Sequence, residues 1–405
     1  MVLNESLDKK IIPIAGGKGG VGKSVISVNL ALSLAISDKR TIIIDLDMGG
    51  ANLHTVLGMK NTNPGVASYL QDKNRSFKSL ILDTPFKNLQ FIPGDTLSYG
   101  MADITEKQKR DIIYEIQDLD ADYIILDLGA GSSFNTIDFF LISNSGLIIT
   151  TPQAGAVMNS YTFLKNLTIR FLQKAFASNK NMEAYLKKNI KRMLPGTNLT
   201  LAHLLHEIGM EEPETRDKAL AYLEVLQPKV ILNMMEEEDD FQMAENLSAL
   251  VKKDLLIDME CLGAILFDRN VDDSLHDRHP FLLEYQDSLT AQQIYRIGQK
   301  IAQSRNFPEL PLDYTEYRDS FELGKIETQN DFELYRQIKD TEGGNSGGDA
   351  VDVDQLMEVI EIQQQKIQEL QQTVRMMGLG QKGQGGGGLL GGGLLGGGSG
   401  GGLFN

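Results

Sequence analysis

The chain has 405 residues, of which 41% are hydrophobic and 23% charged, and its formal net charge is −16. This composition is typical of a globular protein with at least one large core, and the acidic balance argues against nucleic acid as the main partner, because phosphate binding needs concentrated positive charge. No apolar stretch approaches the ~18 residues of a membrane-spanning helix, and residues 1–10 lack the apolar core of a secretion signal. The single cysteine, Cys261, fits a reducing cytoplasm, so we expect a cytoplasmic protein.

The first motif follows an apolar run at 11–14, where residues 16–26 read GGKGGVGKSVI. Residues 27–34 then have helical spacing, and a strand, a glycine-rich turn and a helix form the context in which GxxxxGK[ST] binds phosphate. The backbone N–H groups of such a loop converge on phosphate oxygens, and the helix N-terminus adds its positive dipole end. Lys23 is expected to reach the β- and γ-phosphates, and the Ser24 hydroxyl to bind Mg²⁺. The predicted nucleotide-binding residues are Gly17, Lys18, Gly19, Gly20, Val21, Gly22, Lys23 and Ser24.

A second lysine, Lys18, lies inside this loop and makes KGGVGKS resemble the deviant Walker A motif of the MinD/ParA family, which includes the flagellar regulator FlhG. The resemblance covers about residues 10–305. It implies a Mg²⁺-dependent ATPase that forms a homodimer when it binds ATP. In that family the extra lysine reaches across the dimer interface to the partner's nucleotide, so Lys18 is expected to be catalytic together with Lys23. The iron–sulfur branches of the superfamily use paired cysteines, so no iron–sulfur cluster is expected.

The apolar run at 41–47 ends in two carboxylates, Asp45 and Asp47. Such a run is typical of a buried parallel strand, and ligands of parallel sheets lie beyond the carboxyl ends of the strands. The pattern DxDxxxxN, which ends at Asn52, resembles switch I of the family. The resemblance implies that Asp47 positions the attacking water, that Asn52 senses the γ-phosphate, and that Asp45 helps to arrange the loop and the metal.

A second apolar run, at 123–127, ends in Asp127 and leads to Gly131. It resembles the Walker B strand running into switch II, so Asp127 is expected to hold Mg²⁺ through water. The backbone N–H of Gly131 is expected to follow the γ-phosphate. The intervening Leu128-Gly129-Ala130 departs mildly from the family pattern.

Further strands are predicted at 89–94, 146–152, 229–233 and 262–268, with helices at 105–119, 161–176 and 288–304. Alternation of strands and helices predicts an α/β P-loop NTPase fold, with a doubly wound, mostly parallel sheet of about seven strands and helices on both faces. Asn233 resembles the residue that reads adenine in the family, although Met234 follows it in place of Arg or Lys. Asp268 belongs to what resembles the final loop on the nucleotide side.

Residues 165–192 form a basic tract with eight Lys or Arg and one acidic residue. The tract could contact membrane headgroups or nucleic acid, and the alternative is a solvated helical face. Residues 178–227 are interpreted as a helical insertion into an ATPase domain that spans 1–305.

The composition changes after Arg305. Residues 306–350 are interpreted as an acidic, loosely attached arm. Residues 351–378 carry a short heptad pattern with one polar layer, Gln363, which predicts a coiled-coil helix, and 379–405 form a Gly/Leu-rich flexible tail. The heptad segment is acidic, so we expect it to contact a protein and not an anionic membrane.

The leading hypothesis is therefore a MinD/FlhG-like ATP-dependent dimer switch that positions a division site, a flagellum or another polar structure, in the cytoplasm or at the inner face of the membrane. The alternative is a ParA-like factor that partitions DNA by binding the nucleoid as an ATP dimer. A bacterial tyrosine kinase with a Walker motif is disfavoured, because no tyrosine follows Tyr335. Fold alone does not separate the first two hypotheses.

Overall fold

The structure is a computed structural model that describes residues 9–47, 50–60, 63–72, 74–94, 104–177, 179, 184–186, 188–189, 199–303 and 317–344. The chain divides into two compact units, 1–335 and 336–405. The description below concerns the first unit. The predicted heptad helix and the Gly/Leu-rich tail lie outside the described residues.

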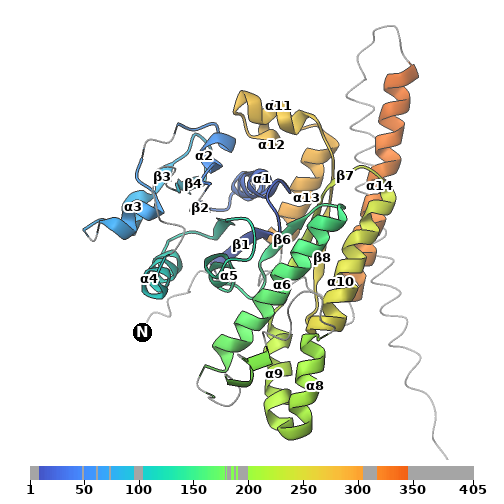
Figure 1. Cartoon of the computed structure of the whole chain (residues 1–405). Helices are drawn as coiled ribbons and strands as arrows, with labels where there is room; N and C mark the ends of the chain where they lie inside the picture. The colour runs from blue at the N-terminus through green and yellow to red at the C-terminus, as the bar shows by residue number, and fades with distance from the viewer. Residues whose placement is uncertain are drawn as a thin grey trace, which may run out of the picture. The chain divides into compact units, whose positions relative to one another are not determined.

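An eight-stranded sheet runs through the first unit in the order β3-β4-β2-β5-β1-β6-β7-β8 (Figure 1). All neighbouring strands are parallel except β3 and β4, so the predicted mostly parallel α/β sheet is confirmed. The eighth strand is the two-residue β3, which is too short to give a periodic signal. The strands are β1 Lys10–Gly16, β2 Thr41–Leu46, β3 Leu82–Asp83, β4 Leu89–Ile92, β5 Tyr123–Leu128, β6 Leu147–Thr150, β7 Lys229–Met235 and β8 Glu260–Leu266.

Helices cover both faces of this sheet (Figure 1). Successive side chains of a strand point to opposite faces, so Ile124 and Leu126 enter one hydrophobic core and Ile125 enters the other. The helices are α1 Lys23–Ile36, α2 Leu53–Val56, α3 Val66–Gln71, η1 Phe77–Leu80, α4 Glu106–Gln117, α5 Phe134–Phe140, α6 Ala154–Ala175, α8 Leu201–Glu211, α9 Pro213–Val225, η3 Glu238–Phe241, α10 Gln242–Leu255, α11 Asn270–Asp277, α12 Phe281–Glu284, α13 Leu289–Gln303 and α14 Tyr317–Gly344. The core on the first face is closed by α4, α5, α6, α8, α9 and α10, and the core on the second by α1, α2, α12 and α13.

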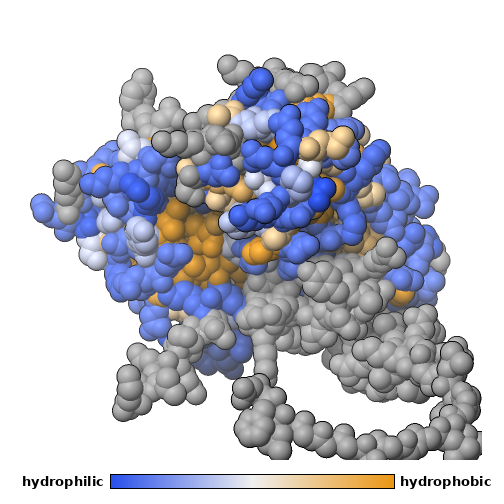
Figure 2. Space-filling view, turned by 90° about the horizontal axis from the view of Figure 1, so that it is seen from below, coloured by the Kyte–Doolittle hydropathy of each residue, from blue (hydrophilic) through white to orange (hydrophobic). Residues whose placement is uncertain are grey.

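The longest described part of the segment interpreted as an insertion, 199–227, is a helical hairpin. Helices α8 and α9 pack on each other, α8 packs on α10, and α9 packs on α6. Three large hydrophobic side chains are exposed on this hairpin: Met210, Tyr222 and Val225. Figure 2 shows that hydrophobic residues also gather in one area of the face seen from below, enclosed mainly by hydrophilic residues. Among the described residues, no helix combines the length and the hydrophobicity needed to span a bilayer.

The segment interpreted as a loosely attached acidic arm differs from that expectation, because most of its described part, 317–335, belongs to the first unit as the first portion of α14. Glu327 accepts a 2.7 Å ion pair from Lys300 of α13, and Asp331 accepts one of 2.7 Å from Arg296. The hydroxyl of Ser320 also accepts the backbone N–H of Cys261 in the edge strand β8, at 3.3 Å. Two acidic residues of the predicted arm, Glu327 and Asp331, are therefore partners of α13, and the helix covers a sheet edge that would otherwise expose backbone donors.

Candidate nucleotide-binding site

The phosphate loop leaves β1 at Gly16 and enters α1 at Lys23. Gly22, directly before α1, has φ +84°, and Gly20 has φ +82°, a backbone conformation that L-residues adopt only at a cost. Within the described residues no side chain caps α1, so the first backbone N–H groups of the helix are free to bind an anion.

Gly17 is required for a different reason, which is a close approach to α6. A Cβ added to Gly17 would lie 2.3 Å from the carbonyl carbon of Asn159 and 2.4 Å from the backbone nitrogen of Ser160. Around Gly19, by contrast, no atom of the described residues lies within 4 Å of an added Cβ. The start of the loop is thus pressed against α6, and its crest, which includes the exposed Lys18, faces open space.

Asp127, at the end of β5, joins the first turn of α1. Its fully buried carboxylate accepts an ion pair from Lys23 at 2.9 Å and hydrogen bonds from the hydroxyls of Ser24 at 2.7 Å and Ser27 at 2.8 Å. The structure thereby brings together the predicted lysine, hydroxyl and Walker B carboxylate. Ser27 was not predicted, although its place one helical turn after Lys23 on the same face of α1 was a usable signal.

This donor set fits a magnesium ion next to phosphates. Mg²⁺ takes oxygen ligands and keeps several waters, and a carboxylate and a hydroxyl lie side by side here. No group of three or more His, Cys, Asp or Glu capable of holding a metal occurs among the described residues. An ion at this site would therefore depend on phosphate and water oxygens to complete its shell, as is usual for nucleotide-bound magnesium.

Asp45 lies opposite Asp127 in the β2–β5 register and is 1% exposed. Burial, with the charge of Asp127 as the second cause, raises the pKa of Asp45 to about 7. Its two oxygens accept the backbone N–H groups of Leu53 and Asp47, each at 3.1 Å. Asp45 therefore ties the loop after β2 back to the sheet.

The two switch segments meet at Asp47. Its carboxylate oxygens lie 3.4 Å from the positions that a Cβ would take on Gly50 and on Gly129. The Gly131 N–H donates to the carbonyl of Gly16 in the phosphate loop at 3.2 Å, and Gly131 has φ +84°. Asn52 directly precedes α2, and its carbonyl accepts the N–H of Thr55.

Asn233 contacts the phosphate loop. Its side-chain amide donates to the carbonyl of Val21 at 2.9 Å and would lie 2.3 Å from a Cβ on Gly22. The following Met234 has φ +59°, an uncommon conformation for a non-glycine residue. Asp268 accepts the backbone N–H of Asn270 and so shapes the loop before α11. The roles of these residues toward a nucleotide stay predictions.

Comparison with known proteins agrees with this geometry. Residues 9–184 match the family model of an AAA domain. The septum site-determining protein MinD of Helicobacter pylori is 30% identical over 186 residues, which are 46% of this chain and 67% of that protein. The chain belongs to the MinD/ParA family of P-loop ATPases.

A further relative supports this assignment, and a solved structure supports the fold. The flagellum site-determining protein YlxH of Helicobacter pylori is 34% identical over 158 residues, and the match spans 38% of this chain and about half, 53%, of that protein. The cell division ATPase MinD of Pyrococcus furiosus has the same fold, with a TM-score of 0.50 at 18% identity over 73% of this chain and 98% of that one. The predicted family is thus confirmed by sequence and the fold by structure.

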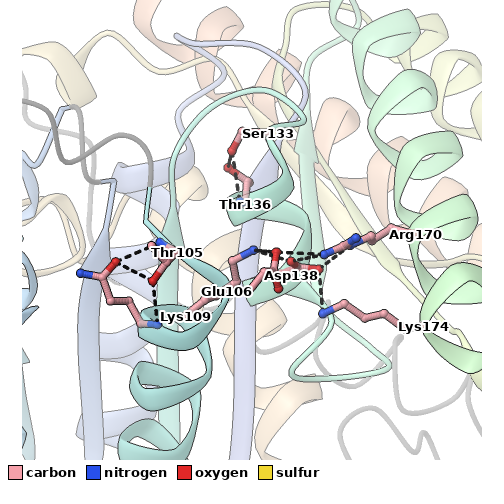
Figure 3. Close-up of polar contacts among 9 residues, drawn as sticks. Thr105, Glu106, Lys109, Ser133, Thr136, Asp138, Arg170 and Lys174 are labelled. Carbon is pink, nitrogen blue, oxygen red and sulfur yellow. Dashed lines mark hydrogen bonds and ion pairs between the residues drawn. The ribbon is translucent and has the colours of Figure 1, made fainter. Parts of the chain in front are cut away.

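Two cations of the basic tract, Arg170 and Lys174 of α6, form ion pairs within the protein (Figure 3), although the side chain of Lys174 is still 44% exposed. Arg170 and Lys174 bind Asp138 of α5 at 2.8 Å each. Burial lowers the pKa of Lys165, with the charge of Asp254 opposing. Contact of this tract with a membrane or with nucleic acid stays a proposal, and residues such as Lys191 lie outside the described part.

Proposed function

We propose that this chain is a Mg²⁺-dependent ATPase whose ATP-bound form is a homodimer, and that the dimer positions a cellular machine such as a division site or a flagellum. The observation that carries the proposal is the constellation of Lys23, Ser24 and Asp127 beneath a glycine loop that carries an additional exposed lysine, Lys18. The names of the two Helicobacter relatives, septum and flagellum site-determining proteins, support a spatial output.

Each residue has a separate task in this proposal. The loop from Gly17 to Ser24 would hold the triphosphate, and Ser24 and Asp127 would hold the magnesium ion. The bound ion supplies positive charge at the phosphates. Lys23 would leave Asp127 to contact phosphate oxygens, and Asp47 would orient the attacking water. Positioning and charge stabilisation are the main requirements of phosphoryl transfer.

The second subunit enters through Lys18. Its side chain is exposed at the crest of the loop, which supports an approach by a partner's nucleotide. The interaction would add a cation to each site only in the dimer, so turnover would depend on dimerisation. We further propose that protein partners bind the C-terminal heptad segment and tail, 351–405, and that the protein acts in the cytoplasm or at the inner face of the membrane. The ion pairs of Arg170 and Lys174 with Asp138 leave less free positive charge on this tract, which makes the nucleoid-binding alternative the weaker one.

Alanine variants of the two loop lysines test the proposal. Lys23→Ala is expected to lower phosphate release by about 100-fold or more, the usual effect of removing one transition-state donor. Lys18→Ala should bind ATP but stay monomeric in light scattering, whereas Asp47→Ala should accumulate as an ATP-bound dimer. Lys87→Ala, at a side chain that is 84% exposed, is the control and should behave as wild type. Normal dimerisation and turnover in all three site variants would refute the proposed cycle.

A further inference from the structure

A cluster of charged side chains around Asp138 lies outside the nucleotide site (Figure 3). Its carboxylate is fully buried among α4, α5 and α6 and is contacted by three cations. Lys109 of α4 lies 2.5 Å from one oxygen, Arg170 of α6 donates to both oxygens at 2.9 and 2.8 Å, and Lys174 of α6 binds at 2.8 Å. Glu106 is the second carboxylate in contact with Lys109 and Arg170.

Asp138 is the central member of this cluster. Burial alone would raise its pKa, but the hydrogen bonds from Arg170, Lys109 and Lys174 outweigh that cause and hold the pKa of Asp138 well below its usual range. The carboxylate is therefore ionised at neutral pH. Without it, three cations would face one another with only the exposed Glu106 to balance them, and an uncompensated buried charge is costly. One side chain thus holds three helices in a fixed arrangement.

Helix α5 leads from this cluster directly to switch II. Asp138 lies about one and a half helical turns after Ser133, whose side chain caps the helix by accepting the N–H of Thr136. Two residues before Ser133 is Gly131, whose N–H donates to the carbonyl of Gly16 in the phosphate loop. A displacement of α5 would therefore move switch II relative to the phosphate loop.

Helix α6 leads from the same cluster to the phosphate loop. Its residues Asn159 and Ser160 form the backbone surface against which Gly17 is pressed. Its Asn166 also donates a 3.1 Å hydrogen bond to the hydroxyl of Ser132, between switch II and α5. Both helices consequently join the Asp138 cluster to segments that border the nucleotide site, which closes a ring from the phosphate loop through α6, Asp138, α5 and switch II.

We propose that Asp138 is a positioning residue for ATP hydrolysis: by fixing α5 against α6 it sets the separation between switch II and the phosphate loop. The inference rests on the proposed ATPase activity. A purely structural role for the cluster predicts lower stability alone. A positioning role also predicts a lower turnover rate in the folded enzyme, since displacements of ~1 Å far from the chemistry can cost about 100-fold.

The test is Asp138→Asn, which keeps the shape of the side chain and removes its charge. We expect kcat for ATP to fall at least about tenfold at a temperature where the variant is fully folded, with the Kd for ADP within about twofold, because the phosphate loop itself is intact. The matched control is Asp122→Asn, whose carboxylate binds Arg40 before the start of β5, away from the switches. It should keep its kcat even if its unfolding temperature falls. An Asp138→Asn enzyme that is less stable but has normal kcat would overturn the inference.

Two further measurements keep the inference testable. If Asp138→Asn does not fold, Lys174→Gln removes the most exposed of the three cations, and the same loss of kcat with unchanged ADP affinity is expected, whereas unchanged kcat would refute it. Amide hydrogen exchange of the nucleotide-free chain is independent of activity. Faster exchange at 128–134 in the Asp138 variant than in the Asp122 variant supports positioning, and equal exchange refutes it. Absence of hydrolysis in wild type would refute the proposed function, and exchange would then decide this inference separately.

Discussion

Gly17 and Gly19 of the phosphate loop are only two residues apart but differ in the space around them. Alanine substitution at each position tests this difference. A Cβ on Gly17 would lie within 2.3–2.6 Å of three backbone atoms of Asn159 and Ser160. Backbone atoms inside a helix cannot move aside as a flexible side chain can, so the loop must shift away from α6. A Cβ on Gly19 would meet no atom of the described residues within 4 Å. The same chemical change is therefore expected to have very different consequences.

The loss of stability expected for each substitution follows from these contacts. Inserting one methyl group into a closely packed site costs about 1–3 kcal/mol, and the contact distances at Gly17 place the cost near the upper end of that range. Gly20→Ala meets no clash but must adopt φ +82°, which costs about 1–2 kcal/mol. Gly19→Ala should be neutral, or slightly stabilising because it restricts the unfolded chain. We therefore expect the destabilisation to decrease in the order Gly17→Ala, Gly20→Ala, Gly19→Ala.

Thermal unfolding of the nucleotide-free protein measures this order, and each kcal/mol is expected to lower Tm by about 2–4 °C. Titration with a fluorescent ADP analogue measures the consequence for binding. If the analogue requires the wild-type loop conformation, it must reverse the shift in Gly17→Ala, and a cost of about 1–3 kcal/mol corresponds to a roughly 5- to 150-fold rise in Kd. Equal Tm values and equal Kd values for the Gly17 and Gly19 variants would refute the packing argument.

Three further expectations concern side chains at other places in the domain. Asn233→Ala should weaken binding of ATP and of inorganic tripolyphosphate by the same factor, because the amide holds the Val21 carbonyl in the phosphate loop; a loss confined to ATP in equilibrium titrations would show base recognition instead. Asp331→Asn should lower the free energy of unfolding by about 1–3 kcal/mol, since Arg296 loses a charged partner, and kcat should be unchanged. An unfolding free energy equal to that of wild type in a denaturant titration would contradict the packing of α14 on α13. Asp138 has a pKa below its unfolded value, so its contribution to stability is present above about pH 4 and is lost as the pH falls through the unfolded and then the folded pKa. The urea midpoints of wild type and Asp138→Asn should therefore converge as the pH falls. A difference between the midpoints that grew at low pH would show that the pKa of Asp138 is not lowered by folding.

Local sequence patterns were sufficient to predict the glycine loop and the two aspartates at the strand ends. The run from Gly16 to Ile26 combines a strand end, a glycine loop and a helix start within a few residues, so its geometry depends mainly on neighbouring backbone. The strands that end near Asp45 and Asp127 could also be predicted locally, because strands buried on both faces are continuously hydrophobic. Since parallel strands end at one edge of the sheet, their aspartates could be expected beside the loop, and β2 and β5 do pair with Asp45 opposite Asp127.

Contacts between segments far apart in the chain could not be predicted from local sequence patterns. The sequence placed Arg170 and Lys174 in a basic tract that was interpreted either as a contact for a membrane or nucleic acid or as a solvated helical face, whereas in the fold both bind Asp138, which lies more than thirty residues earlier in the chain. Likewise, residues 306–350 were interpreted as a loosely attached acidic arm, but two of their acidic side chains, Asp331 and Glu327, pair with Arg296 and Lys300 of α13. The ion-pair partner of a charged residue cannot be predicted from its position in the sequence, because the pairing depends on which helices pack together.

The same division applies to the site itself. Residue types and spacing predicted Lys18, Lys23 and Ser24, since a phosphate loop uses backbone geometry encoded over eight consecutive residues. The approach of Gly17 to α6 and the bond from Asn233 to Val21 instead join residues more than 140 positions apart. Such contacts arise only when the hydrophobic faces of helices and strands have been buried together, because that burial sets the distances between elements and is a property of the whole core.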